Sequence, residues 1–358
     1  MLNSFLIQIT IKALNTMFIT RMISFIYNFL KKLISSCYHF IINLPNWYKA
    51  KINFCKTYIS DFHYRLNNLS TTNLDLGIYH LNKLQINDAI LRFKLVTKFL
   101  DKENKVAHYW LGWCYFLKDN YEQASFHLAQ AVHVDTILLK DFVKNYSRLD
   151  SIPIAIWQQY RDFIAEHYTH NLYSDDVHLP YRFIQKVLYH IKELPNQYSI
   201  LELSSNIGVA GYEIRKRFPD SFILKGVEIS KRMIELSNTY YQKVKIYDML
   251  IQDNLQDVIN HTSETFDVIL SLCGFSYTKD LRYCFDSIAT KLNNRGYLAF
   301  CLPISNTTIY SIRRKEFIFA ILDIENAIDK RKFNILDISE IALKENNKYA
   351  IFVCQKIV

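Results

Sequence analysis

The sequence of 358 residues predicts two kinds of architecture in one chain, a helical N-terminal part and a doubly wound α/β domain. The helical part is predicted by a self-similarity at an offset of 35 residues between positions 70 and 135. The α/β domain is predicted because short apolar runs alternate with helical patterns from residue 197 to residue 358. The last two apolar runs are joined by a polar turn, so we expect the sheet to end on a β-hairpin.

The composition supports a globular protein. Hydrophobic residues make up 50% of the chain and charged residues 22%, so a core can form and intrinsic disorder is excluded as the general state. The seven cysteines are scattered without a CxxC pair, and their number is odd. A disulfide framework and a metal site are therefore not expected, and a reducing, cytoplasmic environment fits the sequence best.

The positive charge of the chain is concentrated at its N-terminal end. Basic residues outnumber acidic ones by 43 to 34, and residues 1–66 hold eight of the basic residues with the single acid Asp61. The remaining residues are almost neutral, so the sequence gives little reason to expect nucleic acid as a partner. The eight basic residues are Lys12, Arg21, Lys31, Lys32, Lys49, Lys51, Lys56 and Arg65.

Residues 1–66 form a basic amphipathic segment. From Leu14 to Leu33 apolar residues recur at helical spacing, with cations and polar residues on the other face. The longest uncharged run, Leu33 to Tyr48, is shorter than the roughly 18 residues that a membrane span needs. Two interpretations stay open. The segment packs on the following repeats, or it binds an anionic membrane surface, which would place the protein peripherally at the inner face of the membrane.

Residues 67–150 contain the repeat. The pair Leu76-Gly77 recurs as Leu111-Gly112, and Ala89 recurs as Ala124. This pattern resembles the tetratricopeptide (TPR) repeat, in which small residues lie where two helices approach closely. The resemblance implies a binding surface for a protein or peptide partner, and the alternative is a structural spacer. Because two repeats are too few to stand alone, residues 13–64 and 137–169 are the candidates to cap them. His80 and His108 occupy core positions of the repeats, where we expect packed side chains.

Residues 151–196 are predicted to bridge the two parts. Two helices are expected, at Ile152–His167 and Tyr181–Leu194, with the polar stretch Tyr168–His178 between them. His178 precedes the second helix and is a weak catalytic candidate at a site entrance. An exposed loop histidine is the alternative.

Residues 197–358 carry the predicted sheet. The expected strands are Tyr198–Leu203, Phe222–Ile229, Met249–Gln252, Phe266–Leu272, Tyr297–Leu302, Phe333–Ala342 and Tyr349–Gln355. The expected helices between them are Val209–Phe218, Lys231–Gln242 and Asp280–Leu292. The helix Asp280–Leu292 is expected to lead through Asn293–Gly296 into the fifth strand.

This domain resembles the class I S-adenosylmethionine-dependent methyltransferases, whose Rossmann-like seven-stranded sheet ends in such a hairpin. Residues 70–358 together look like the bacterial subgroup that carries TPR repeats ahead of the catalytic domain. The stretches that bear the resemblance are Leu201–Gly211, Gly226–Ser230, Tyr247–Leu250 and Phe266–Ile269. The resemblance implies S-adenosylmethionine as the methyl donor.

The resemblance also assigns cofactor-binding positions in the loop after the first strand. The family pattern of an acid and three glycines falls here on Glu202, Ser204, Asn206 and Gly208. Asn206 tolerates a left-handed backbone and is expected to keep the turn. Ser204 departs from the pattern, since its side chain narrows the space for a ligand.

Further along the sheet the resemblance assigns Glu228, followed by Ile229, to the ribose hydroxyls of the cofactor. A carboxylate suits that task because it only accepts hydrogen bonds. Asp253 falls where the family often binds the adenine amino group. Cys273 replaces a residue that is commonly polar or acidic near the reaction centre. Tyr277, the nearest hydroxyl, is a weak catalytic candidate.

The sequence thus predicts a methyltransferase that acts on an unidentified acceptor, with repeats that bind a partner. The alternative is a catalytically degenerate domain that serves as a scaffold or interaction protein. Ser204 and Cys273 favour the alternative, whereas Gly208 and Glu228 oppose it.

Overall fold

The computed structural model describes residues 27, 28, 30, 31, 46–131, 134–174, 179–191, 198–217, 222–240, 244–343 and 347–357. The chain divides into two compact units, Met1–Leu69 and Ser70–Val358. Most of the amphipathic pattern predicted between Leu14 and Leu33 lies outside the described residues.

The described part of the first unit is dominated by helix α2, Asn46–Asn67. Several of its aromatic and aliphatic side chains face solvent, and Asp61 pairs with Arg65 one turn later at 2.9 Å. Throughout the described ranges, no helix combines the length and the apolar character that crossing a bilayer requires.

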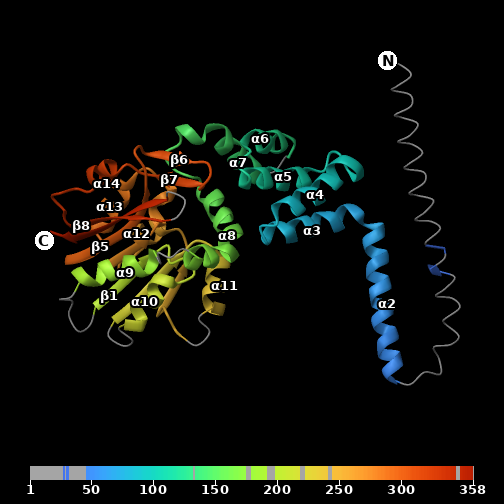
Figure 1. Ribbon diagram of the computed structural model, residues 1–358, viewed down its shortest axis with the longest axis horizontal. Helices are drawn as coiled ribbons and strands as arrows, with labels where there is room; N and C mark the ends of the chain where they lie inside the picture. The colour runs from blue at the N-terminus through green and yellow to red at the C-terminus, as the bar shows by residue number, and fades with distance from the viewer. Residues whose placement is uncertain are drawn as a thin grey trace, which may run out of the picture. The chain divides into compact units, whose positions relative to one another are not determined.

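The second unit begins with helices joined by short turns, namely α3 (Leu69–Asn82), α4 (Ile86–Leu95), α5 (Lys105–Leu117), α6 (Tyr121–Gln130) and α7 (Val134–Asn145). Figure 1 shows them following one another along one end of the unit. A Cβ atom added to Gly77 would lie 2.4 Å from the ring of Phe93, and one added to Gly112 would lie 2.5 Å from Leu128. The same close helix approach therefore occurs twice at the predicted offset. Membership of the TPR family stays a prediction.

The first of these helix pairs is one residue longer than the usual repeat of 34 residues. The structure accommodates the additional residue in a π-helical turn, Val96–Leu100, that follows α4 directly. The amide of Asp101 donates to the carbonyl of Val96 at 2.9 Å, a separation of five residues. A π-turn takes up one residue more than an α-turn, so the second helix pair keeps its packing.

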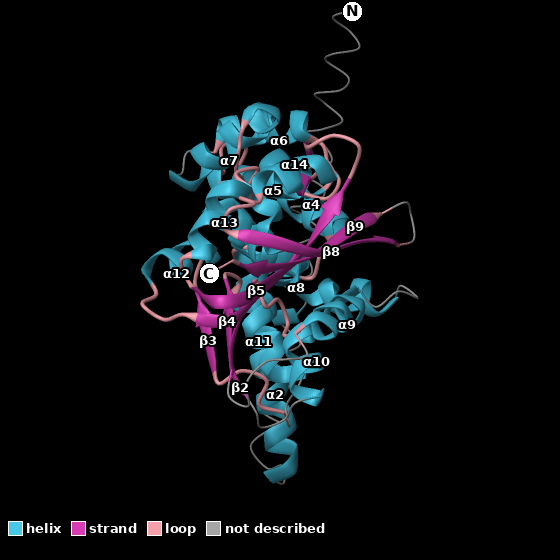
Figure 2. Cartoon of the chain, turned by 90° about the vertical axis from the view of Figure 1, so that its left-hand side faces the viewer, coloured by secondary structure: helices cyan, strands magenta, loops and turns pink. Residues whose placement is uncertain are grey.

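The sheet has seven strands in the order β3-β2-β1-β4-β5-β9-β8, as predicted for a doubly wound domain that ends on a hairpin. The strands are β1 (Tyr198–Leu203), β2 (Phe222–Glu228), β3 (Met249–Gln252), β4 (Phe266–Leu272), β5 (Leu292–Ile304), β8 (Phe333–Ala342) and β9 (Lys348–Lys356). The first five are parallel, and β9 runs antiparallel to both β5 and β8. Figure 2 shows the strands with helices packed around them.

Helices cover both faces of this sheet. On one face α9 (Leu179–His190) and α10 (Val209–Arg217) pack against residues such as Ile200. On the other face α12 (Leu255–His261), α13 (Leu281–Ala289) and α14 (Ile321–Ala327) pack against residues such as Leu201. Burial on both faces explains why the strands appear as nearly continuous apolar runs in the sequence.

Some sequence predictions were wrong in detail. The helix expected to end at His167 is α8, which spans Ile154–Ser174, because the ring of Tyr168 still packs on the Arg161 guanidinium of the same helix face. The strand expected to begin at Tyr297 is β5, which begins at Leu292 and contains Arg295 with a left-handed backbone beside a shift in the β4 register. The short elements α12, β6 (Ile309–Ser311), β7 (Glu316–Ile318) and α14 were not predicted.

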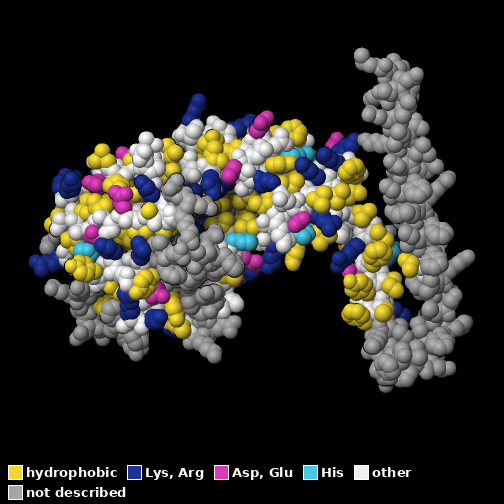
Figure 3. Space-filling view, in the orientation of Figure 1, with side chains coloured by type: hydrophobic (Ala, Val, Ile, Leu, Met, Phe, Trp, Pro, Cys, Tyr) yellow, Lys and Arg dark blue, Asp and Glu magenta, His cyan; other side chains and the backbone are white. Residues whose placement is uncertain are grey.

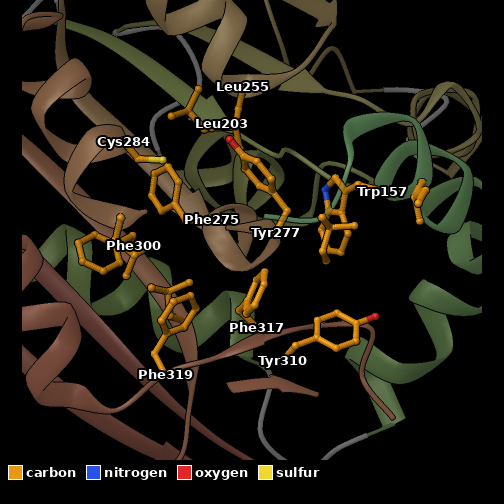
Figure 4. Packing of buried hydrophobic residues seen from close by; sticks show 14 of the residues in the cluster. Trp157, Leu203, Leu255, Phe275, Tyr277, Cys284, Phe300, Tyr310, Phe317 and Phe319 are labelled. Carbon is orange, nitrogen blue, oxygen red and sulfur yellow. The ribbon is translucent and has the colours of Figure 1, made fainter. Parts of the chain in front are cut away.

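The helical repeats and the sheet share one hydrophobic core within the second unit. This core runs from Leu81 in the repeats to Phe352 in the sheet. The ring of Trp113 on α5 contacts Phe163 on α8 with centroids 5.4 Å apart. Figure 4 shows Trp157 and Tyr310 within the same cluster as Phe300 of β5.

Candidate functional site

The loop after β1 adopts the backbone that the family pattern requires. The φ angles of Ser204, Asn206 and Gly208 are 57°, 55° and 85°. A left-handed backbone costs a residue with a Cβ about 1–2 kcal/mol, so Ser204 and Asn206 are held there by their surroundings. At Gly208 a Cβ would lie 2.9 Å from the Ser237 hydroxyl, so this position needs glycine for space as well as for φ.

Ser204 and Cys273 form adjoining turns at the ends of β1 and β4. Cys273 is also left-handed, with φ of 60°, and its amide donates to the carbonyl of Cys301 on β5 at 2.9 Å. A Cβ on Gly274 would lie 2.7 Å from the Ser204 hydroxyl. The two residues that depart from the family pattern therefore lie side by side at the carboxyl edge of the sheet, where ligands bind in open α/β sheets.

Glu228 at the end of β2 links the loop after β1 to the loop after β2. Its side chain is 1% exposed, and its two oxygens accept hydrogen bonds from the amides of Asn206 and Ser230 at 2.8 and 2.9 Å. Because a carboxylate offers about four acceptor positions, the two amides leave capacity for further donors. The carboxylate is thus held rigidly by the loop that follows β1.

Arg161 of α8 is a buried cation at the same place. Its Nη2 lies 3.7 Å from Glu228 Oε2 and donates to the side-chain oxygen of Asn206. The guanidinium also lies over the rings of Trp157 and Tyr168, at 5.7 and 5.2 Å from their centroids. The contact with Glu228 is longer than a hydrogen bond, so the two groups interact mainly through charge.

Glu202 lies on β1 beside the loop and outside the pocket lining. Its Oε2 accepts a hydrogen bond from the Tyr247 hydroxyl at 2.9 Å, and its Oε1 has no hydrogen-bond partner. Burial raises the pKa of Glu202 to about 8, and the Tyr247 hydrogen bond opposes this only in part. The carboxyl group is therefore mostly protonated at neutral pH. It packs under Gly211 of α10, where a Cβ would lie 2.9 Å from Oε2.

A shallow hollow lies at the carboxyl ends of the first strands, and its empty space of about 220 Å³ includes open solvent. It is lined by Trp157, Ser204, Val227, Ile229, Asp253, Asn254, Leu255 and Tyr277. Asp253 is exposed and accepts a hydrogen bond from the amide of Asn254 at 2.7 Å. The pocket therefore combines apolar walls with a carboxylate at its rim.

Tyr277 lies inside this cluster. Its ring is buried between Trp157 and Leu255, as Figure 4 shows. Burial raises the pKa of its hydroxyl well above its usual value, so the phenol stays protonated at neutral pH. His178, the other weak catalytic candidate, lies outside the described residues. Within the described ranges, no group of three or more histidine, cysteine or acidic side chains is placed to hold a metal ion.

The structure thus brings four predicted residues, Ser204, Ile229, Asp253 and Tyr277, to one pocket. It joins Asn206 to Glu228 and places Glu202, Gly208 and Cys273 in supporting positions around the loop. Sequence motifs missed the two α8 residues, Trp157 and Arg161. The only signal in the sequence was an arginine one turn after a tryptophan on a face that is otherwise apolar.

Comparison with known proteins identifies one matching family. Residues 206–300 match the sequence profile of a family described as methyltransferase domain. This part of the chain is therefore similar to a methyltransferase domain. The matched range runs from Asn206 in the loop after β1 to Phe300 in β5, and it includes Glu228, Asp253 and Cys273.

One curated relative of the methyltransferase domain is malonyl-[acyl-carrier protein] O-methyltransferase 1 of Ilyobacter polytropus. It is 29% identical over 150 residues, which cover 41% of this chain. The match spans about half of the relative's own length, 52%.

Two solved structures similar to this chain are methyltransferases. The magnesium protoporphyrin IX methyltransferase of Synechocystis, with bound S-adenosylmethionine, has a TM-score of 0.43 at 11% identity, covering 56% of this chain and 96% of that one. An S-adenosylmethionine-dependent methyltransferase of Clostridium acetobutylicum has a TM-score of 0.40 at 13% identity, covering 57% and 100%.

Proposed function

We propose that the chain binds S-adenosylmethionine in the pocket at the carboxyl ends of β1, β2 and β3 and transfers its methyl group to an acceptor. The observation that carries the proposal is the combination of this pocket with the buried carboxylate of Glu228, whose chain neighbours Val227 and Ile229 line the pocket and which accepts a hydrogen bond from the Asn206 amide. When bound, the cofactor supplies an activated methyl group, so the protein needs to position the reactants and exclude water.

The residues present fit the adenosine portion of such a cofactor. Ile229 and Leu255 belong to the pocket lining and offer apolar surface for a purine ring. Asp253 accepts hydrogen bonds at its rim, as an exocyclic amino group requires. Glu228 has acceptor capacity beyond its two amide donors, which suits neighbouring hydroxyl groups. Ser204, in place of a glycine, stands in the wall of the pocket and restricts its size.

The acceptor is proposed from the named relative. That protein is a malonyl-[acyl-carrier protein] O-methyltransferase, so a carboxylate on an acyl-carrier protein is the first acceptor to test. The expected role of the repeats, binding a protein or peptide partner, stays a prediction, and an acyl-carrier protein is one candidate for that partner.

The decisive experiment measures thermal unfolding of the full chain with and without S-adenosylhomocysteine. A ligand at 100 times its dissociation constant stabilises the folded state by about 2.7 kcal/mol. Glu228→Gln is expected to reduce the shift, and Glu264→Gln, a change at an exposed acid paired with Lys225, is the matched control. No shift for the folded wild-type chain at millimolar ligand supports the alternative, a degenerate domain that acts as a scaffold.

A further inference from the structure

A buried arginine next to the cofactor loop has no role in the function proposed above. Arg161 is 9% exposed and reaches the loop from α8, 45 residues away in sequence from its partner Asn206. Its neighbour Trp157, one helical turn earlier, lines the pocket. Arg161 therefore lies one helical turn from a residue of the pocket lining and contacts the loop after β1.

The contacts of Arg161 hold its guanidinium in a fixed direction. The rings of Trp157 and Tyr168 lie within 6 Å of it, the range in which a cation is attracted to an aromatic ring. Nη2 is directed at Asn206 and lies 3.0 Å from the Met233 sulfur. Its ion pair with Glu228 is only a long contact of 3.7 Å. A planar fork held in this way is suited to bind a carboxylate through two hydrogen bonds.

The ligand in the proposed function brings such a carboxylate. The amino-acid end of S-adenosylmethionine carries one carboxylate and one ammonium group, and a buried carboxylate requires a cation or several N–H donors. Ser204 of the loop after β1 lines the pocket, and Asn206 of the same loop accepts a hydrogen bond from Arg161. Arg161 is the buried cation that contacts this loop among the described residues.

We propose, as an inference that rests on the proposed function, that Arg161 binds the carboxylate of the amino-acid portion of the cofactor. The guanidinium donates to the ligand carboxylate, and its long contact with Glu228 weakens. The Glu228 carboxylate is then available to accept hydrogen bonds from the ribose hydroxyls. The charges stay balanced, since the ligand brings one carboxylate and one ammonium to an existing pair of opposite charges. Arg161 thereby distinguishes complete cofactors from adenosine derivatives that lack the amino acid.

The test compares two ligands that differ only in this part. The full chain is titrated calorimetrically with S-adenosylhomocysteine and with 5′-methylthioadenosine, which keeps the adenosine and thioether but lacks the carboxylate. Arg161→Gln is expected to weaken the first ligand by about 10- to 100-fold, the range for losing a charge-assisted hydrogen bond. Binding of 5′-methylthioadenosine should change by less than about threefold, because that ligand makes no contact with the guanidinium.

Controls separate the possible failures. Arg161→Lys keeps the positive charge but loses the planar fork. It should lower the affinity for S-adenosylhomocysteine relative to that for 5′-methylthioadenosine, and it provides the test if Arg161→Gln does not fold. Arg232→Gln removes an arginine of the neighbouring helix α11 (Lys231–Tyr240) that pairs with Glu166, and it should leave both affinities unchanged. Equal weakening of both ligands, or tighter binding of either, overturns the role of Arg161. If the wild-type chain binds neither ligand, the proposed function itself fails.

The first unit presents a candidate interaction surface, which rests on a separate observation. Along α2 the side chains of Phe54, Tyr58, Ile59 and Phe62 are 69%, 68%, 44% and 49% exposed. Their spacing places them on one helix face, and Figure 3 shows hydrophobic side chains exposed along this helix. An exposed apolar face of this kind indicates an interaction site.

The positive charge of the same unit favours an anionic partner. Residues 1–66 carry eight basic residues and one acid, whereas the rest of the chain is nearly neutral. A basic helix with an aromatic apolar face binds in the interface of a bilayer that contains anionic lipids. We infer that α2 binds an anionic lipid surface with the face that contains Phe54 and Phe62.

Vesicle flotation of the full chain tests this surface. Vesicles of phosphatidylcholine with and without phosphatidylserine are compared at low and high salt. Phe54→Ser with Phe62→Ser should reduce binding to the anionic vesicles by at least about tenfold. Tyr64→Ser, at an equally exposed aromatic residue on the other side of the helix, should retain it. Equal binding to both vesicle types, no binding, or equal loss in the two variants overturns the inference.

Discussion

Glu202 should make the stability of this protein fall as the pH rises through the neutral range. Its carboxyl group is buried beside the loop after β1. One oxygen accepts a hydrogen bond from the Tyr247 hydroxyl, and the other has no hydrogen-bond partner. Replacing it with glutamine keeps the shape and an acceptor for the Tyr247 hydroxyl. The replacement removes the need to bury a negative charge, so Glu202→Gln isolates the effect of ionisation.

The magnitude follows from proton linkage. The pKa of Glu202 is raised from 4.5 to about 8. Below pH 4.5 the carboxyl is protonated in both the folded and the unfolded chain and costs nothing. Above that pH the unfolded state releases the proton while the folded state keeps it, so stability is lost up to a pH of about 8. The loss is roughly 1 kcal/mol at pH 5, about 3 kcal/mol at pH 7 and approaches about 5 kcal/mol above pH 8.

The assay is urea unfolding of wild type and Glu202→Gln at pH 5, 7 and 8.5, followed by circular dichroism. The variant is expected to gain stability over wild type as the pH rises, by about 2 kcal/mol between pH 5 and 7. Glu235→Gln, at an acid paired with Arg232 on an exposed part of α11, serves as the control and should show no such trend. A stability difference that is independent of pH would refute the burial of a protonated carboxyl at this position.

Three further predictions concern the helical repeats and their contact with the sheet. Gly112→Ala should destabilise the fold by about 1–3 kcal/mol in urea unfolding, since its Cβ would overlap Leu128; a more stable variant contradicts the close helix approach. The pKa of His127 is lowered to about 4 by burial and by the neighbouring His108, so stability is lost as the pH falls from 6.5 to 4. His127→Phe should remove about 1–3 kcal/mol of this acid sensitivity, and parallel pH profiles would argue against it. Lys315→Ala should cost about 2 kcal/mol by removing a buried ammonium that pairs with Asp119 and lies over two aromatic rings. An effect in thermal unfolding no larger than that of an exposed lysine would contradict this.

The sheet could be predicted from the sequence because its strands are buried on both faces. The predicted bounds of β1, β3, β4 and β8 coincide with the observed ones. Apolar runs of four to ten residues and the turn residues between them depend on neighbours in the chain, which is the information that a sequence pattern holds. The elements that were missed, such as β6 and β7, are too short for a periodic pattern.

Part of the candidate site was predictable for the same reason. Ser204, Asn206 and Gly208 follow a strand, and their left-handed backbone is a local property of the turn. Glu228 ends the next strand, and parallel strands bring their carboxyl ends to one edge. Motif spacing therefore located the loop and its acid.

The sequence by itself determined the succession of strands along the chain, the closing hairpin, the repeated glycine contacts and the basic N-terminal segment. Only the tertiary structure decided that Arg161 faces Glu228, that Trp157 forms a wall of the pocket and that Glu202 stays protonated near neutral pH. The reason is physical. Local patterns reflect which residues prefer a helix, a strand or a turn. Burial and charge depend on contacts between segments far apart in the chain, which exist only when α8 has packed onto the sheet.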